Sequence, residues 1–115
     1  MAPPTTAPDW LRITTSVAAG RKGSPQGTAV ADAEVAAFFG AASVSDFAER
    51  DGRIVYSGPQ EWGYRRFILH YAHLCRMAGG IDAFLIGSEM RGLTWTRDQA
   101  GGYPAVAQYR TLAAE

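Results

Sequence analysis

Glu89 stands directly after a short hydrophobic run, in the stretch IDAFLIGSEMRGL that covers residues 81–93. A continuous apolar run such as 81–87 predicts a strand of a parallel sheet that is buried on both faces. In α/β folds, functional side chains gather at the carboxyl ends of such strands. A carboxyl group at a partly apolar mouth can keep a proton near neutral pH, which a general acid requires. A plainer role is also open, that of a loop-capping carboxylate beside Arg91.

Three aromatic residues could offer flat apolar faces to a sugar ring. Trp95 follows in the same loop as Glu89, Tyr56 ends an earlier expected strand, and Trp62 falls in an expected helix. Each could instead pack locally. Local packing is the better interpretation for Trp95 and even more so for Trp62, whereas the two interpretations of Tyr56 are equally open. Arg91 could orient Glu89 or lower its pKa, and a lowered pKa would work against the acid role.

Metal and nucleotide sites are not expected, and no cofactor is implied. His70 and His73 are three residues apart on one helix, but a third ligand is not evident nearby. The stretch GRKGS, residues 20–24, resembles a phosphate loop only superficially. Its Lys22 precedes Gly23, whereas a Walker loop needs the lysine directly after the second glycine.

The composition is that of one modest globular domain. The chain has 115 residues, of which 47% are hydrophobic and 19% are charged. Its 11 basic residues are balanced by 11 acidic residues, so no basic field is available to hold a nucleic acid. The single cysteine, Cys75, is expected to be a buried thiol. No apolar stretch approaches the ~18 residues of a membrane span, so membrane insertion is not expected.

Hydrophobic periodicity and turn signals divide the chain into short elements. The expected elements are an extended lead-in over 1–9, a strand over 10–17, a helix over 28–39 closed by Gly40, a helical turn over 45–50, an Asp51-Gly52 turn into a strand over 53–58, a helix over 59–78 closed by Gly79-Gly80, the strand over 81–87 and a helix from 103.

The helix over 59–78 carries the strongest pattern. A capping box between Ser57 and Gln60 and a proline at position 59 mark its expected start. Apolar residues then recur at steps of three and four and predict one buried face. That face consists of Tyr64, Phe67, Ile68, Tyr71, Leu74, Cys75 and Ala78, and the charged residues Arg65, Arg66, His70, His73 and Arg76 lie mostly away from it.

The second half of the chain therefore reads helix, tight loop, buried strand, loop, helix. This βα repeat predicts an α/β fold, the class of open parallel sheets and eight-stranded barrels. Three strand candidates are too few for a barrel, and a cut sheet would leave apolar edges unpaired. We expect residues 10–115 to form part of a larger domain.

The stretch YSGPQEWGYRRFILHYAHLCRMAGGIDAFLIGSEMRGLT, residues 56–94, resembles the glycoside-hydrolase-type TIM-barrel domain of gene transfer agent tail proteins. These are large baseplate-hub, or host-specificity, proteins of phage-like particles in alphaproteobacteria. Residues 12–40 resemble the segment that precedes it in that family, and residues 103–115 resemble the helix that follows. The resemblance implies that 10–115 is a partial (β/α)8 TIM barrel, covering about the third and fourth βα units.

The resemblance also implies roles for individual residues. Glu89 matches the general acid/base at the end of the fourth strand, with Tyr56, Ser88, Arg91 and Trp95 as substrate contacts. A retaining glycosidase needs a second carboxylate about 5 Å away as nucleophile. In the family it follows the seventh strand, which this chain does not reach, so the 115 residues alone are expected to be inactive. Ser88 replaces an asparagine that contacts the sugar 2-hydroxyl in many such enzymes.

Three functions follow as hypotheses. In the first, the chain acts on cell-envelope polysaccharide or peptidoglycan, alongside other tail and baseplate proteins, in the tail of a phage-like particle assembled in the bacterial cytoplasm. In the second, the barrel is catalytically silent and serves as a tail-hub scaffold or a carbohydrate-binding module. In the third, the chain is a small intracellular α/β enzyme complete at 115 residues.

Overall fold

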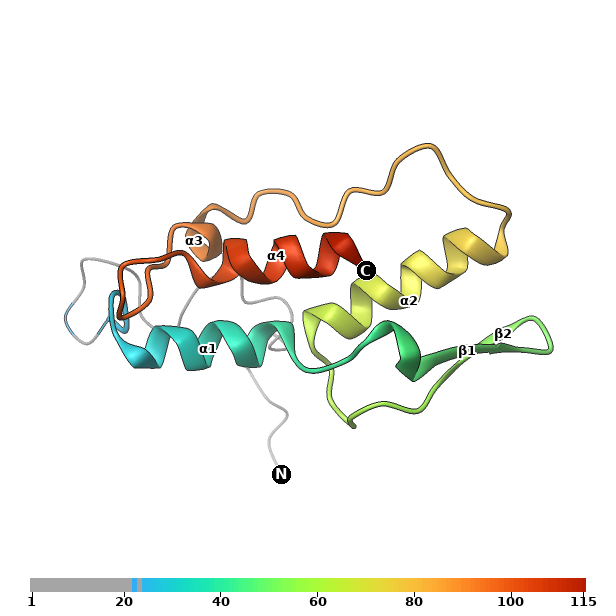
Figure 1. Cartoon of the computed structure of the whole chain (residues 1–115), viewed down its shortest axis with the longest axis horizontal. Helices are drawn as coiled ribbons and strands as arrows, with labels where there is room; N and C mark the ends of the chain where they lie inside the picture. Colours follow the sequence, from blue (N-terminus) through green and yellow to red (C-terminus); the bar gives the residue numbers. More distant parts are fainter. Residues whose placement is uncertain (1–21, 23) are drawn as a thin grey trace, which may run out of the picture.

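A computed structural model describes Lys22 and residues 24–115 (Figure 1). The elements are α1 (Ala29–Phe39), the 3-10 turn η2 (Val44–Asp46), β1 (Phe47–Arg50), β2 (Arg53–Tyr56), α2 (Tyr64–Met77), α3 (Arg91–Thr94) and α4 (Pro104–Ala114). The molecule measures 51 × 40 × 22 Å. Helices α1 and α4 lie side by side, and the hairpin β1–β2 lies beside α2 at one end. The strand expected over 10–17 and the lead-in over 1–9 lie outside the described residues.

Helices α1 and α4 begin and end where local signals predict them. Gly40 ends α1 with a φ of 76°, a left-handed conformation that favours glycine. Pro104 opens α4, where its missing N–H costs no helical hydrogen bond. The predictions of both helices are confirmed.

The two strands form an antiparallel hairpin. Arg50 pairs with Arg53, which leaves Asp51 and Gly52 as the loop, with φ values of 52° and 75°. Positive φ at both positions defines a type I′ turn, for which Asp-Gly is a favoured sequence. The predicted turn is confirmed. The helical turn expected over 45–50 is wrong beyond residue 46, since η2 gives way to β1 there.

Helix α2 starts later than the capping pattern predicts. Residues 57–63 are not helical, and Gly63 occupies the N-cap position. A methyl group at Gly63 would stand 2.6 Å from the carbonyl oxygen of Phe39, so only glycine lets the start of α2 touch the end of α1. The predicted capping box between Ser57 and Gln60 is therefore wrong. The predicted stop at Gly79-Gly80 is confirmed, with φ values of 99° and 101°.

The buried face of α2 also differs from the prediction. Tyr64, Arg65, Ile68 and Leu69 are buried, whereas Phe67, Tyr71 and Leu74 are exposed. Arg65 can be buried because its polar atoms find partners. Its Nε donates to the Ala42 carbonyl at 2.7 Å, and its Nη2 pairs with the Glu115 carboxylate.

The buried strand expected over 81–87 is not formed. The segment is an irregular connection between α2 and α3, with Ile81 52% and Leu85 84% exposed. The N–H groups of 81–89 make no backbone hydrogen bond to the described residues. A strand needs a neighbour to accept such bonds, and the described sheet consists of β1 and β2. The prediction is wrong for that reason.

Phe39 lies at the centre of the core. It is fully buried, and its ring makes edge-to-face contacts with Phe38, Tyr64 and Tyr109 at centroid distances of 5.4, 5.7 and 5.1 Å. These rings come from α1, α2 and α4. One aromatic cluster therefore joins the three long helices.

Ionisation of the Tyr109 hydroxyl should lower the stability of the fold at alkaline pH. Its oxygen is buried without a hydrogen-bond partner, and the neighbouring Tyr64 hydroxyl donates to the Ile86 carbonyl at 2.6 Å. Burial, and then the Tyr64 hydroxyl, raise the pKa of Tyr109 above its ordinary value of about 10. The hydroxyl therefore loses its proton at a lower pH in the unfolded chain than in the folded one. Its contribution to the free energy of unfolding is fully present below pH ~10 and is lost as the pH rises above that value.

Phenylalanine has no proton to lose, so Tyr109→Phe should be less sensitive to alkaline pH than the wild type. When the pH rises from 7 to 11, we expect the free energy of unfolding to fall by about 1 kcal/mol less in Tyr109→Phe than in the wild type. Urea denaturation at the two pH values measures it. Tyr71→Phe, which removes an exposed hydroxyl, is the matched control. Identical alkaline losses in wild type and Tyr109→Phe would contradict the expectation.

Candidate functional site

Four of the residues predicted from sequence lie in one exposed segment. Ser88 and Glu89 end the connection before α3, Arg91 opens α3, and Trp95 follows it. Glu89 has a φ of 56°, a left-handed conformation that is uncommon for a residue with a side chain. The Arg91 guanidinium carbon lies 3.9 Å from the centre of the Trp95 ring, so Arg91 is engaged with Trp95.

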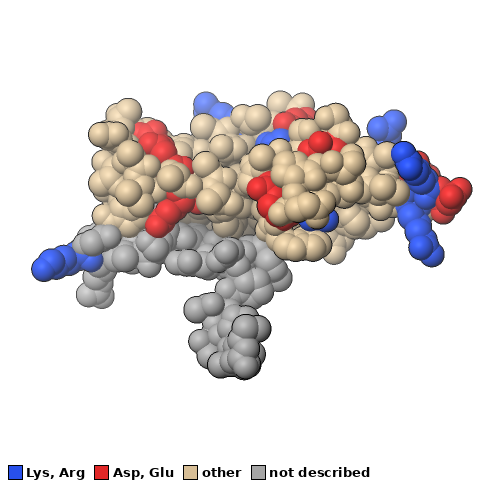
Figure 2. All heavy atoms as spheres, turned by 90° about the horizontal axis from the view of Figure 1, so that it is seen from below, with Lys and Arg blue, Asp and Glu red and all other residues tan. Residues whose placement is uncertain are grey.

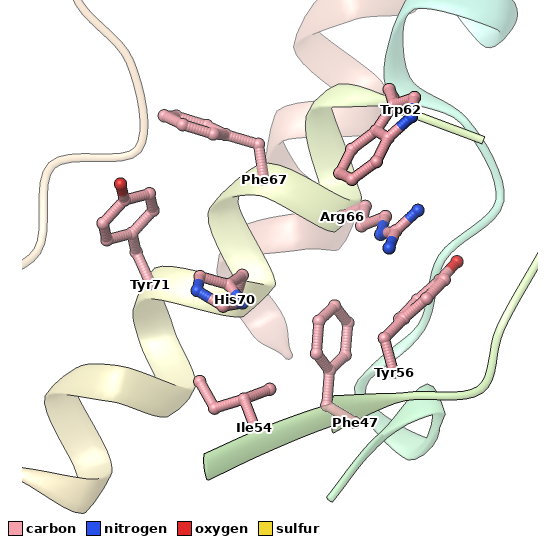
Figure 3. A pocket seen from close by; sticks show the side chains of 9 residues that line it. Phe47, Ile54, Tyr56, Trp62, Arg66, Phe67, His70 and Tyr71 are labelled. Atoms are coloured by element: carbon pink, nitrogen blue, oxygen red, sulfur yellow. The ribbon is translucent and has the colours of Figure 1, made fainter. Parts of the chain in front are cut away.

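Tyr56 lies elsewhere, in a groove between the hairpin and the first half of α2 (Figure 3). The groove has a volume of about 510 Å³, and none of the other four predicted residues lines it. Its lining is mostly aromatic. The lining residues are Phe47, Ile54, Tyr56, Trp62, Gly63, Arg66, Phe67, His70 and Tyr71.

One end of the groove is a three-layer stack. The guanidinium carbon of Arg66 lies 3.9 Å from the Tyr56 ring centre and 4.0 Å from the Trp62 ring centre. Figure 3 shows the Arg66 side chain reaching out between the two rings. Such cation–π pairs stabilise a planar cation between two planar faces. Trp62 is nevertheless 77% exposed, so much of its ring surface faces solvent.

Backbone contacts hold this stack in place. The Tyr56 hydroxyl donates to the Pro59 carbonyl at 2.7 Å, and Arg66 Nη1 donates to the Glu61 carbonyl at 2.8 Å. Burial raises the pKa of Tyr56, and the Arg66 charge opposes that rise. The hydroxyl therefore stays protonated and keeps its bond to the loop before α2.

The rest of the groove is an aromatic floor and wall. Phe47 is 7% exposed and packs against Tyr56, with ring centres 5.0 Å apart. Phe67 and Tyr71 form the opposite wall, with ring centres 5.1 Å apart. No aspartate or glutamate side chain lines the groove. The arrangement can stack planar or ring-shaped ligands and attract a negative charge.

Sequence reasoning missed most of this groove. The periodicity predicts Phe67 and Tyr71 on the buried face of α2, but both are exposed. It also predicts Trp62 inside the helix, but Trp62 precedes the Gly63 cap and is exposed. A signal was present in the spacing. The adjacent pair Arg66 and Phe67 is followed three to five residues later by the pair His70 and Tyr71, so the four side chains share a helix face beside the one that is buried.

The segment from Trp62 onward matches a known family model over residues 62–115. The matching family is described as the GTA TIM-barrel-like domain. GTA denotes gene transfer agent, and the resemblance stated from sequence is confirmed over this segment. No match is found among curated proteins or among solved structures.

The GTA TIM-barrel-like segment contains α2, α3 and α4, together with Glu89 and the Trp62 and Arg66 side of the groove. Helices and strands are both present in the described chain, as the predicted α/β class requires, and the strands are β1 and β2. A partial barrel covering the third and fourth βα units stays a prediction.

Among residues 24–115 and Lys22, no group of three or more His, Cys, Asp or Glu side chains is placed to hold a metal ion. None of the described helices has the length and apolar character to cross a bilayer. Figure 2 shows acidic side chains scattered over one face, and the basic side chains of the described part form no continuous patch there.

Proposed function

We propose that this chain is part of a gene transfer agent protein and that its aromatic groove binds cell-envelope glycan, either polysaccharide or peptidoglycan. The family match over residues 62–115 supports the gene transfer agent assignment. The observation that carries the glycan proposal is the stack of Tyr56, Arg66 and Trp62 at the end of a groove lined by further aromatic rings.

Sugar rings have apolar C–H faces that pack on aromatic rings, while their hydroxyl groups stay at the polar edges. Binding pockets with apolar walls and a few fixed polar groups suit such ligands. Trp62 leaves 77% of its surface to solvent, so a ligand that packs on its ring would bury apolar surface, which favours binding. Because Arg66 already holds the Trp62 ring in place, the ring should lose little conformational entropy when a ligand binds.

This function places the chain in the tail of a phage-like particle, beside other tail and baseplate proteins, after assembly in the bacterial cytoplasm. The glycan would be met when the particle contacts a recipient cell. The support for this setting is the family match alone.

We expect Trp62→Ala to weaken glycan binding by the purified chain at least tenfold, or about 1.4 kcal/mol, because it removes the exposed stacking face. Calorimetric titration with cell-envelope oligosaccharides measures it. Tyr103→Ala, which removes another aromatic ring that faces an arginine outside the groove, is the matched control and should bind as the wild type does.

Two results would contradict the groove as the binding site. The first is unchanged affinity in Trp62→Ala. The second is a loss of affinity in Trp95→Ala instead, which would move the binding surface to α3. No binding by the wild type or by any variant would reject glycan binding in the groove.

Glycoside hydrolysis by Glu89 is a second candidate. One observation favours it: Glu89 holds a left-handed φ of 56° inside the family-matched segment. A residue with a side chain pays roughly 1–2 kcal/mol for that conformation, and such strain gathers at functional sites. Ser88, Arg91 and Trp95 would then contact the substrate. Equal hydrolysis rates for the whole gene product and its Glu89→Gln variant would remove this role.

A further inference from the structure

We infer that the groove is selective for an acidic sugar, with Arg66 receiving the carboxylate of the sugar while the aromatic rings pack on its face. This inference rests on the proposed glycan binding and names the class of glycan. It begins from the charges of the groove, whose lining contains Arg66 and His70 and no carboxylate.

The carboxylates nearest to the stack are engaged by other groups. The Glu61 side chain accepts a hydrogen bond from the Ala41 N–H, at the end of α1. Asp46 accepts from the Ser43 N–H at 2.8 Å, within the η2 cap. Both lie close enough to Tyr56 to influence its ionisation, but neither is paired with Arg66 within 4 Å in the described chain. The charge of Arg66 is therefore available to a ligand.

The geometry of the stack leaves a defined part of Arg66 open. The guanidinium carbon of Arg66 lies over the ring of Tyr56 and over the ring of Trp62. Arginine carries five N–H donors in one plane, and within the described residues the Glu61 carbonyl takes one of them, on Nη1. The donors that remain point outward from the edge of the plane. A planar carboxylate matches such an edge with two parallel hydrogen bonds.

A carboxylate that is carried on a sugar ring fits both features at once. A ring carboxyl group projects from the rim of the sugar, while the C–H face of the sugar lies against an aromatic side chain. The exposed surface of Trp62 and the wall formed by Phe67 and Tyr71 provide such faces in the groove. A neutral sugar would use the same faces but offer only uncharged hydroxyl acceptors to the Arg66 donors, which make weaker hydrogen bonds than a carboxylate does.

Titration of the purified chain with two matched probes tests the inference. The probes are a short oligogalacturonate and a neutral galacto-oligosaccharide of equal length. We expect the acidic probe to bind at least tenfold more tightly at low salt and to lose most of that advantage at high salt. Arg66→Gln should reduce the acidic probe to the affinity of the neutral one, whereas Trp62→Ala should weaken both probes by a similar factor.

Arg53→Gln is the matched control, since it removes an exposed arginine of the hairpin that does not line the groove. Arg66→Lys keeps the charge and loses the planar fork, so an intermediate affinity is expected even if Arg66→Gln does not fold. Equal binding of both probes by the wild type overturns the inference and leaves glycan binding intact. Tighter binding of a phosphorylated sugar overturns the carboxylate assignment. Binding of neither probe overturns the inference and the proposed function together.

Discussion

Phe39→Ala is expected to lower the free energy of unfolding by about 3–5 kcal/mol. The side chain is fully buried, and its ring touches Phe38, Tyr64 and Tyr109, so its loss opens a cavity where α1, α2 and α4 meet. A small domain has a total stability of roughly 5–15 kcal/mol. This one substitution therefore removes a large part of the stability of the fold.

Urea denaturation followed by circular dichroism measures the loss. Phe67→Ala is the matched control, because it removes the same group from a position that is 46% exposed, and it should cost about 1 kcal/mol. If the two variants lost the same stability, the aromatic cluster around Phe39 would not be the centre of the core.

Glu89→Gln carries the largest expected effect on activity. If Glu89 is a general acid/base, its amide replacement should slow glycan hydrolysis by the whole gene product by roughly 10²–10⁴-fold. The shape of the side chain is kept, but an amide cannot give or take a proton as a carboxyl group does. Glycan affinity should stay unchanged, since Glu89 does not line the groove that we propose for binding.

Release of reducing sugar from purified cell-envelope glycan is the measurement. Asp82→Asn is the control, because it removes a second exposed carboxylate from the same connection. Equal rates in wild type and Glu89→Gln, with binding retained, would reject the catalytic role and leave recognition as the function of the chain. A matching loss in Asp82→Asn would point to the loop itself and not to the Glu89 proton.

The helices could be predicted where the signal is local. Gly40 ends α1 and Pro104 begins α4 through their own backbone preferences, which need no partner elsewhere in the chain. The Asp51-Gly52 turn is local in the same sense. The apolar run over 81–87 is different, because a strand forms only with neighbours, and no described strand lies beside it.

The burial of α2 and the groove depend on contacts between distant residues. Arg65 is buried because its partners are Ala42 and Glu115, which lie 23 and 50 residues away in sequence. Periodicity alone assigns a charged residue to the exposed face. Arg66 is the centre of the candidate site because the hairpin places the Tyr56 ring against one side of it, a contact that periodicity does not predict. Of the substrate contacts that the family resemblance implies, Tyr56 is the one that lines this groove. Trp62, for which the sequence favours local packing, lines it as well.

The absence of a side chain at Gly63 has a consequence for the thermodynamics of recognition. Its backbone touches that of Phe39 and Gly40, so the junction between the end of α1 and the start of α2 is rigid. Trp62 directly precedes Gly63, so its backbone is held at the same junction. A ligand that settles on its indole should therefore find a surface that is already in place, and calorimetry should register association driven by enthalpy, with little conformational entropy lost by the protein.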